Sequence, residues 1–288
     1  IKLLWITKMK KFSVLILPFL LIVCSKPGEI VTIKDAKIKN TTGKVRTGLD
    51  ILLTDHFNSI RDMNIALITN TLNESGEICP SYDSITSKIE INLKKVFHFD
   101  SDWVTLQSET NRLGNGISIH LIDDAIEKTS TLISNMTSNI DAILIDVQDI
   151  GSRNSIYLSN LIKVLSHKKL KGLEVIILDR PNPLGGQIIE GPILDSLYEE
   201  VDMLPIPSRH GLTTGELFYM AIHEKMLVNH PAKIIIIKMD GWERQMFYPD
   251  TKLPWIFSNL GYPDTETILL KVGLELFEGL NLSNGTGT

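Results

Sequence analysis

Residues 140–182, IDAILIDVQDIGSRNSIYLSNLIKVLSHKKLKGLEVIILDRPN, predict how this chain folds. Two short apolar runs, 140–146 and 173–179, flank a segment near 154–168 whose apolar residues recur at helical spacing. Each run is continuously apolar instead of alternating, which is typical of strands that are buried on both faces. Two such strands joined by a helix form a strand–helix–strand unit, and this unit predicts a parallel sheet.

The same alternation of strand and helix patterns extends over most of the chain. Further strands are expected at 64–69, 94–99, 117–121 and 233–238, and further helices at 47–60 and near 80–91, 124–137 and 213–227. Thr47 stands at the N-cap position of the first of these helices. The predicted fold is therefore α/β, a Rossmann-like open and mainly parallel sheet with helices on both faces.

Length and composition restrict the classes of function. The chain has 288 residues, of which 43% are hydrophobic and 22% charged, and this is enough for a sizeable core in one large or two modest domains. A formal net charge of -5 without a basic block argues against a nucleic-acid partner. No nucleotide-binding glycine loop and no paired-histidine or His-Glu-x-x-His motif occurs, so we expect neither a cofactor nor a metal site.

The first residues predict export. Met9-Lys10-Lys11 precedes the apolar run 12–24, which has the length of a signal-peptide core and is too short to span a membrane. Residues 1–24 are therefore expected to be a signal peptide, and the protein is expected in the periplasm or on the cell envelope. Cys24 and the two residues after it resemble a loosely matched lipobox. Lipidation of Cys24, with a membrane tether, is one expectation, and cleavage elsewhere is the alternative.

The rest of the chain is predicted to have two parts. Residues 25–45 are polar and lack a sustained period, which is typical of a tether, and 46–288 form the domain. Beyond the signal peptide only Cys79 remains, so the core and not a disulfide framework has to stabilise the domain.

Polar residues gather where the predicted strands end. In open parallel sheets, ligands bind outside the carboxyl ends of the strands, near a switch point in strand order. The strand ends here offer Asn70, 98–102, 146–149 and 179–182. The last of these runs into a turn rich in proline and glycine, which fixes Arg180 and Asn182 in place. We interpret this turn as one wall of a polar-ligand site, and specifically of a sugar site.

The stretch 146–157 allows two interpretations. Asp149 either caps the following helix and pairs with Arg153, or both side chains hold hydroxyl or carboxylate groups of a ligand, with Gly151 allowing the backbone to approach it.

The stretch 207–220 is similarly open. The spacing of Thr213 and Glu216 predicts a capping box, which explains Glu216 without a function. It leaves Arg209 and His210 unexplained, and these lie in the loop that feeds a helix N-terminus, where anionic groups are favoured. Glu190 is either a surface residue after a turn or part of the site.

These motifs follow one another in a specific series. The series is Asp146-Val-Gln-Asp149-Ile-Gly-Ser-Arg153, Asp179-Arg-Pro-Asn-Pro-Leu-Gly-Gly186, Glu190-Gly-Pro192, Pro207-Ser-Arg-His-Gly-Leu-Thr-Thr-Gly-Glu216, Gly241-Trp-Glu-Arg244, Trp255 and Glu278-Gly-Leu-Asn281-Leu-Ser283. From about Val45 to Thr288 it resembles the NamZ-type exo-β-N-acetylmuramidases, formerly a domain of unknown function. The resemblance implies a Rossmann-like domain that carries the site in a cleft against a smaller C-terminal domain.

The resemblance also implies an activity. Such bacterial enzymes remove β-linked N-acetylmuramic acid from the non-reducing ends of peptidoglycan fragments in cell-wall turnover, without a cofactor. Glycoside hydrolysis needs a carboxylic acid that protonates the leaving oxygen, and the lactyl carboxylate of muramic acid calls for an arginine. The expected catalytic residues are Asp100, Glu190, His210 and Glu216, and the expected substrate-binding residues are Asn70, Asp149, Arg153, Arg180, Asn182, Arg209 and Asn281.

The sequence departs from the family pattern at several positions. Asp100 stands where the family has the glutamate of Pro-Glu-His-Gly, the natural candidate acid. Aspartate is one methylene shorter, and a displacement of about 1 Å can cost on the order of 10²-fold in rate. The loop 258–261, 271–273 and Thr286 also differ, and the chain stops at Thr288, where the family continues into its second domain. The alternative expectation is a catalytically impaired sugar-binding lipoprotein, or a truncated relic of the enzyme.

Overall fold

The computed structural model describes residues 31–70, 80–88, 90–99, 117–122, 129–153, 155–193, 204–227, 231, 233–255, 264–274 and 277. Seven strands form one sheet in the order β1-β9-β6-β5-β2-β3-β4, with every neighbouring pair parallel. They are β1 (Val31–Lys34), β2 (Asn64–Thr69), β3 (Asn92–Phe99), β4 (Ser118–Ile122), β5 (Ala142–Asp146), β6 (Glu174–Leu178) and β9 (Lys233–Ile237). The order from β4 to β9 is that of a doubly wound Rossmann sheet, and the predicted fold class is confirmed.

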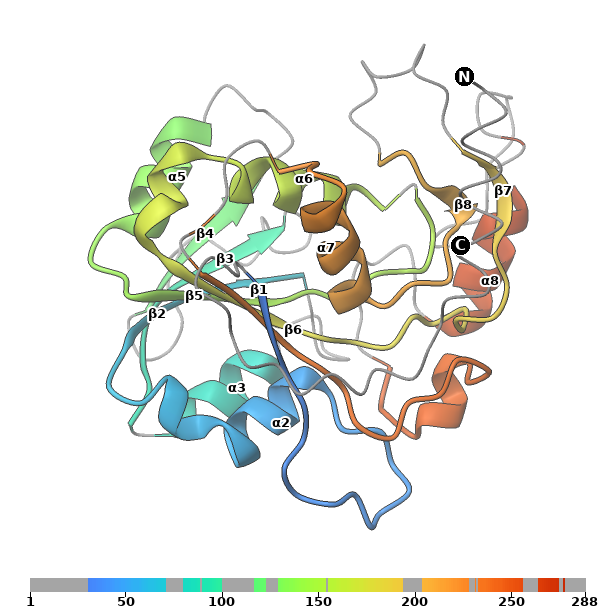
Figure 1. The fold of residues 1–288 in the computed structure, drawn as a ribbon, viewed down its shortest axis with the longest axis horizontal. Coiled ribbons are helices and arrows are strands. Elements are labelled where there is room, and N and C mark those ends of the chain that lie inside the picture. Colours follow the sequence, from blue (N-terminus) through green and yellow to red (C-terminus); the bar gives the residue numbers. More distant parts are fainter. Residues whose placement is uncertain are drawn as a thin grey trace.

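Helices cover both faces of this sheet (Figure 1). One face carries α5 (Thr129–Thr137), α6 (Ile156–Leu165) and α7 (Thr214–His223), and the other carries α2 (Gly48–Asp55) and α3 (Pro80–Thr86). Short 3-10 turns η1 (Phe57–Ser59), η4 (Lys168–Gly172) and η6 (Tyr248–Thr251) complete the connections. Within the described residues, no helix has the length and apolar character needed to cross a membrane.

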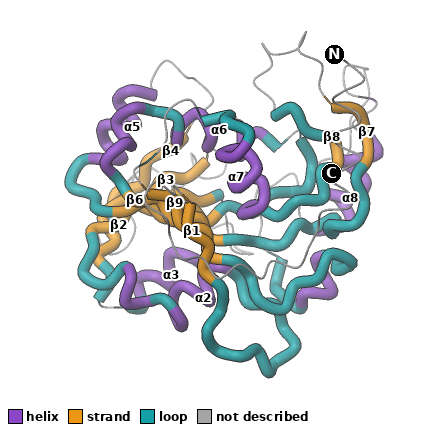
Figure 2. The backbone as a smooth tube through the Cα atoms, in the orientation of Figure 1, coloured by secondary structure: helices purple, strands orange, loops and turns teal. Residues whose placement is uncertain are grey.

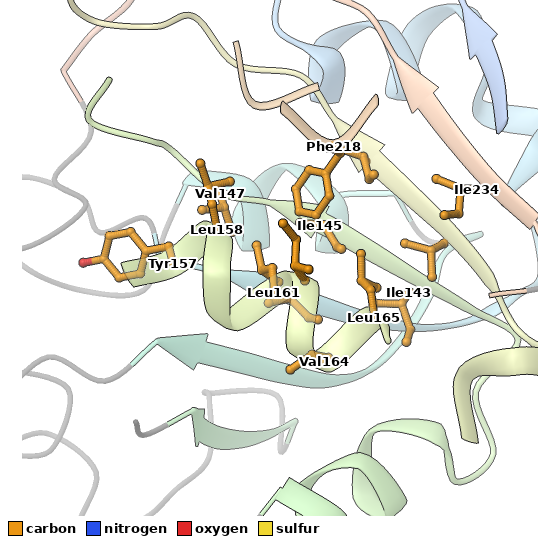
Figure 3. Close-up of a cluster of buried hydrophobic side chains, with 14 of the residues drawn as sticks. Ile143, Ile145, Val147, Tyr157, Leu158, Leu161, Val164, Leu165, Phe218 and Ile234 are labelled. Carbon is orange, nitrogen blue, oxygen red and sulfur yellow. The ribbon is translucent and has the colours of Figure 1, made fainter. Parts of the chain in front are cut away.

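The core has two layers because the inner strands are apolar on both sides. Toward α6, the side chains of Ile143 and Ile145 from β5 meet Leu161 and Leu165, and Phe218 of α7 joins them (Figure 3). Toward α2, Leu144 of the same strand packs in the opposite layer. Full burial of an aliphatic or Phe side chain stabilises a fold by roughly 1.5–3 kcal/mol, so this continuous apolar pattern, which predicted the strands, also holds the three layers together.

Two helices begin at capping boxes, one where the sequence predicts an N-cap, at Thr47, and one where it predicts the box itself, at Thr213 and Glu216. The Thr47 hydroxyl accepts from the backbone N–H of Asp50, and the Asp50 carboxylate accepts from the backbone N–H of Thr47. Thr213 and Glu216 make the same reciprocal pair at the start of α7. Each cap satisfies backbone donors that the helix itself leaves open, so both helix starts are confirmed, and Glu216 has the structural role that its spacing indicates.

A second, smaller unit lies beyond the carboxyl ends of the large sheet and contains β7, β8 and α8 (Figures 1 and 2). Strands β7 (Glu190–Ile193) and β8 (Pro207–Arg209) pair antiparallel, with Glu190 opposite Arg209. Helix α8 (Thr265–Leu274) buries Ile268 against Ile150 and Leu184. This unit stands over the sheet edge where ligands bind in such folds.

The predicted tether is wrong over its described part. Residues 31–34 form the edge strand β1, which pairs with β9 along its whole length. Just after it, the Asp55 carboxylate accepts from the backbone N–H groups of Lys37 and Ile38 at 2.6 and 2.9 Å. A strand of four residues gives too short a pattern to stand out from its polar surroundings. Residues 31–45 therefore belong to the domain.

Candidate functional site

The switch point of the sheet lies between β2 and β5, and Asn70 joins the two strands there. Its side-chain amide donates to the carbonyl oxygen of Gln148 at 2.9 Å, and its side-chain oxygen accepts from the backbone N–H of Gln148 at 2.9 Å. Asn70 is completely buried. Both the nitrogen and the oxygen of the Asn70 side-chain amide are thus bonded to the protein backbone. This predicted substrate-binding residue therefore has a structural role at the switch point.

Arg180 is also held from within. Its Nε and Nη2 donate to the two carboxylate oxygens of Asp146 at 2.5 and 2.8 Å, with side-chain exposures of 3% and 0%. The pair joins the ends of β5 and β6. A charge pair so deep in the protein is stable only while both partners remain. Asp146 therefore neutralises this arginine, which sequence reasoning placed among the substrate-binding residues without naming its partner.

Asp149, in the loop after β5, and His210, directly after β8, form a buried pair. His210 Nε2 lies 3.1 Å from Asp149 Oδ2, and the same oxygen accepts from the backbone N–H of Gly151 at 2.8 Å. His210 Nδ1 accepts from the backbone N–H of Leu212 at 3.1 Å. Because Nδ1 acts as an acceptor, the proton of a neutral ring is on Nε2 and points at Asp149.

The structural interpretation of this loop is wrong in both of its parts. Asp149 does not cap α6, whose N-cap residue is Ser155, and its carboxylate instead contacts the backbone N–H of Gly151 and the ring of His210. Arg153 donates through Nη1 to the carbonyl oxygens of Pro192 and Ile206 at 2.6 and 2.7 Å. The fold thus uses Arg153 to fasten the loop to the β7–β8 unit, a contact between segments too distant in sequence to show in a local pattern.

Arg209 and Glu190 face each other across the β7–β8 pair. Arg209 Nη1 lies 3.1 Å from Glu190 Oε2, and Nη2 donates to the carbonyl oxygen of Leu184 at 2.5 Å. The Arg209 side chain is 7% exposed, whereas that of Glu190 is 62% exposed. The guanidinium carbon lies 6.0 Å from the ring centroid of Phe247. This ion pair differs from Arg180–Asp146 because one of its partners is in solvent.

Two further predicted residues have internal partners. Asn182 donates to the carbonyl oxygen of Leu212 and accepts from the backbone N–H of Leu184, both at 2.9 Å, so it fixes the turn after β6. Glu216 forms an ion pair with Arg244 in addition to its cap. Glu216 is half-buried, and its carboxylate is already bonded to the N-terminus of α7 and to Arg244.

Asp179 is the carboxyl whose proton affinity the fold changes most clearly. Burial raises the pKa of Asp179 to about 7, although the N–H of Gly215 donates to its Oδ1 at 2.8 Å. The nearby Glu216 carboxylate acts in the same direction as burial. Asp179 lies between α2 and α7, where a Cβ on Gly48 or Gly215 would touch it. It is enclosed by protein and does not line the surface beside β7.

Buried polar atoms without a hydrogen-bond partner gather in the loop after β5 and on the strand paired with it. Among the described side chains they include Gln148 Oε1, Asp149 Oδ1, Arg153 Nε, Ser155 Oγ and Arg209 Nε. The two segments are joined by the Ser152–Arg209 bridge and the Arg153 N–H bond to Ser208. Such atoms are rare in folded proteins and mark places where a ligand or ordered water completes the structure. We take this cluster as the candidate site.

Three predicted residues lie outside the described part of the chain, namely Asp100, Asn281 and Cys24. Within that part, no group of three or more His, Cys, Asp or Glu side chains is placed to hold a metal ion. Sequence reasoning missed Gln148 and Ser155 as site residues, since an amide and a hydroxyl in a loop have no pattern of their own. For Gln148, its position just after a core strand was the available signal.

Comparison with known proteins places the chain in a family. Residues 65–264 match the family model for the N-terminal part of exo-β-N-acetylmuramidase NamZ. The chain belongs to the NamZ family. The residues of its candidate site, from Gln148 to Arg209, fall within the matched residues, so the resemblance seen in the sequence motifs is confirmed at the level of the family.

Individual proteins of known sequence or structure are also similar to this chain. The chain is 32% identical over 260 residues to the peptidoglycan β-N-acetylmuramidase NamZ of Bacillus subtilis (strain 168). The aligned residues cover 87% of this chain and 61% of that protein. Two crystal structures of DUF1343 family proteins from Bacteroides fragilis share 27% and 25% identity, with TM-scores of 0.70 and 0.60. Each covers 82% of this chain, which spans 61% and 62% of theirs. The chain thus spans about three fifths of the length of these three proteins.

Proposed function

We propose that the protein is an exo-acting glycosidase that removes β-linked N-acetylmuramic acid from the non-reducing ends of peptidoglycan fragments. Membership of the NamZ family supports this reaction, as does similarity to the peptidoglycan β-N-acetylmuramidase of Bacillus subtilis. The observation that carries the proposal is the cluster of unpartnered buried polar atoms around Asp149 and Arg209, at the sheet edge where such folds bind ligands. A sugar has many hydroxyl groups, and these can partner donors and acceptors alike.

The proposed acid is Asp100, which comes directly after the last residue of β3 in the sequence. Glycoside hydrolysis needs one carboxylic acid to protonate the leaving oxygen and a second group to stabilise the charge or activate water. Asp149 is suited to the second role because two donors hold one of its oxygens and the other has no partner. Glu216, which caps α7 and pairs with Arg244, is less suited to proton transfer.

The test is release of 4-nitrophenol from 4-nitrophenyl β-N-acetylmuramide by the purified protein, compared with Asp100→Asn and Asp100→Glu. We expect the asparagine variant to lose turnover and the glutamate variant to exceed the wild type, because the longer side chain restores the reach of the family's acid. Circular dichroism melting of all three proteins controls for folding. Turnover that is unchanged in Asp100→Asn would refute the assignment of the acid.

A second candidate is a sugar-binding protein that recognises the same glycan without cleaving it. It is favoured by one observation, the aspartate at the position of the family's glutamate. Ligand-induced thermal stabilisation by N-acetylmuramic acid, with no release of nitrophenol by any of the three proteins, would select this candidate.

We further propose that the chain is exported and acts at the cell envelope. The support is in the sequence, where residues 1–24 have the charge and apolar pattern of a signal peptide that ends at Cys24. Metabolic labelling with a fatty acid, compared between wild type and Cys24→Ala expressed in a bacterium, tests the lipid anchor. Labelling that persists in the alanine variant would refute attachment at this residue.

A further inference from the structure

We propose that Arg209 recognises the carboxylate of the acidic sugar, and that Glu190 is an internal carboxylate that the ligand displaces. The inference rests on the proposed function and names the residue that distinguishes an acidic N-acetylhexosamine from a neutral one. It assigns to Glu190 a role in specificity instead of proton transfer.

The comparison of the three candidate arginines singles out Arg209. Arg180 donates to both carboxylate oxygens of Asp146, and neither side chain is more than 3% exposed. Arg153 donates to the carbonyl oxygens of Pro192 in β7 and of Ile206 just before β8, and also to the Ser208 hydroxyl. Removing either set of contacts would break the fold around the site. Only for Arg209 is a carboxylate partner found at the surface, so among the three it is the cation whose anion can be exchanged.

Glu190 is suited to being displaced. Its side chain is 62% exposed, and all four residues of β7 are exposed. Ion pairs with an exposed partner contribute little to stability. The exchange therefore costs little, because Glu190 can turn into water while a ligand carboxylate takes its place at Nη1.

The surroundings of Arg209 favour a sugar over a simple anion. The guanidinium keeps an unpartnered donor, Nε, although the side chain is more than nine-tenths buried. Phe247, over whose ring the guanidinium lies, is 41% exposed, and Ile189 is 61% exposed. A cation with donor capacity beside exposed apolar side chains matches a ligand that carries a carboxylate, a methyl group and a sugar ring together. The lactyl ether of N-acetylmuramic acid has this combination.

Equilibrium binding of two sugars tests the inference. N-acetylmuramic acid and N-acetylglucosamine differ only in the lactyl group. The ratio of the dissociation constant of N-acetylglucosamine to that of N-acetylmuramic acid, measured by calorimetry, therefore isolates the contribution of this group. We expect Glu190→Gln to favour N-acetylmuramic acid further, by roughly two- to fivefold in this ratio, because the competing carboxylate is gone. Arg209→Gln should reduce the preference by roughly ten- to a hundredfold.

Glu224→Gln is the matched control. It removes the same charge from an exposed residue at the opposite end of α7, so it changes the net charge without touching Arg209. The ratio should stay at its wild-type value. Since Glu190 and Glu224 are exposed, both glutamine variants are expected to fold, and this comparison stands even where Arg209→Gln does not.

The outcomes separate the inference from the proposed function. Binding of both sugars with a ratio that Glu190→Gln leaves unchanged, or that Glu224→Gln changes equally, overturns the role of Arg209 and leaves the glycosidase proposal standing. Failure of the folded protein to bind either sugar overturns both. A ratio that rises in Glu190→Gln alone and falls as salt is added supports the inference.

Discussion

Asp146 and Arg180 place two full charges inside the protein at the ends of neighbouring strands. Their mutual attraction and hydrogen bonds offset the cost of removing both from water only while the pair is complete. A single substitution therefore leaves an uncompensated buried charge. This makes the pair a structural element at the floor of the candidate site.

We predict that Arg180→Met destabilises the protein by about 3–5 kcal/mol, because Asp146 loses its partner. The double variant Arg180→Met/Asp146→Leu should recover most of this loss, since it removes both charges. Urea denaturation at pH 7 measures the free energies of unfolding. The exposed pair Lys233–Glu174 provides the control, and Lys233→Met is expected to cost less than about 1 kcal/mol. A double variant no more stable than the single one would contradict this account.

Asp179 gives a pH dependence of stability. The pKa of this carboxyl is raised from 3.8 to about 7 in the fold by burial, so the unfolded chain releases its proton at lower pH than the folded one does. The stabilisation is fully present below about pH 4 and is lost as the pH rises toward 7. Asp179→Asn keeps an acceptor for Gly215 and removes the titration.

We therefore expect Asp179→Asn to gain on the wild type between pH 4 and 7. A pKa difference of about 3, at about 1.4 kcal/mol per pKa unit, sets about 4 kcal/mol as the upper limit of this gain. Thermal melting across this range measures it. Asp35→Asn, at a side chain that is 71% exposed, controls for the general effect of losing a carboxylate. Parallel pH profiles of wild type and Asp179→Asn would contradict the raised pKa.

For single residues, the sequence predicts which side chains lie at the ends of the strands, but it does not predict which groups they bond. Apolar runs located the strand ends, and thus placed Asn70, Asp149 and Arg180 at the same sheet edge. Whether such a side chain faces a ligand or another residue depends on which strands are neighbours. Asp146 and Arg180 meet because β5 and β6 are adjacent, 34 residues apart in sequence.

Among the elements, α2 packs tightly against the ends of β6 and β9, and Gly48 allows this. A Cβ at this position would lie 2.3 Å from the backbone nitrogen of Asp179 and 2.6 Å from the carbonyl oxygen of Ile237. The N–H of Gly48 also donates to the carbonyl oxygen of Asp179 at 2.8 Å. The first turn of the helix is therefore held directly against β6 and β9.

We predict that Gly48→Ala destabilises the protein by about 1–3 kcal/mol or more, because backbone atoms cannot give way as side chains do. Gly273→Ala is the matched control. It lies in α8 with open space around its Cβ position, and the same substitution there should stabilise by about 0.5–1 kcal/mol. Thermal melting of the two variants should give shifts of opposite sign. A tolerated Gly48→Ala would contradict the packing of α2.

The elements themselves were more predictable than their ends. The six strands that the sequence predicts for the large sheet all appear within two residues of their predicted bounds, since continuous apolar runs are a strong signal. The helix expected at 80–91 ends at Thr86, and that expected at 47–60 ends at Asp55 before a 3-10 turn. Helix ends depend on the tertiary contacts of the last turn, which a periodic pattern does not record.

For the whole molecule, the doubly wound sheet consists of two halves that meet between β2 and β5, and Asn70 bonds across this junction. We predict that Asn70→Ala destabilises the protein by about 2–6 kcal/mol, because it leaves two buried backbone groups of Gln148 without partners at about 1–3 kcal/mol each. Asn70→Asp keeps the acceptor and loses the donor. At pH 7 urea denaturation should rank it below the wild type, and equal stability of the two would contradict the role of the amide.

The edge strand β1 sets how far the molecule could stand from a membrane. A chain anchored by a lipid on Cys24 would have only residues 25–30 between the lipid and Val31, the first residue of the sheet. At about 3.5 Å per residue, six residues reach roughly 20 Å at full extension, less than a domain of this size measures across. Such a protein would lie close to the bilayer with its edge strand β1 nearest the lipid. It would reach only those glycan ends that lie within its own diameter of the lipid headgroups.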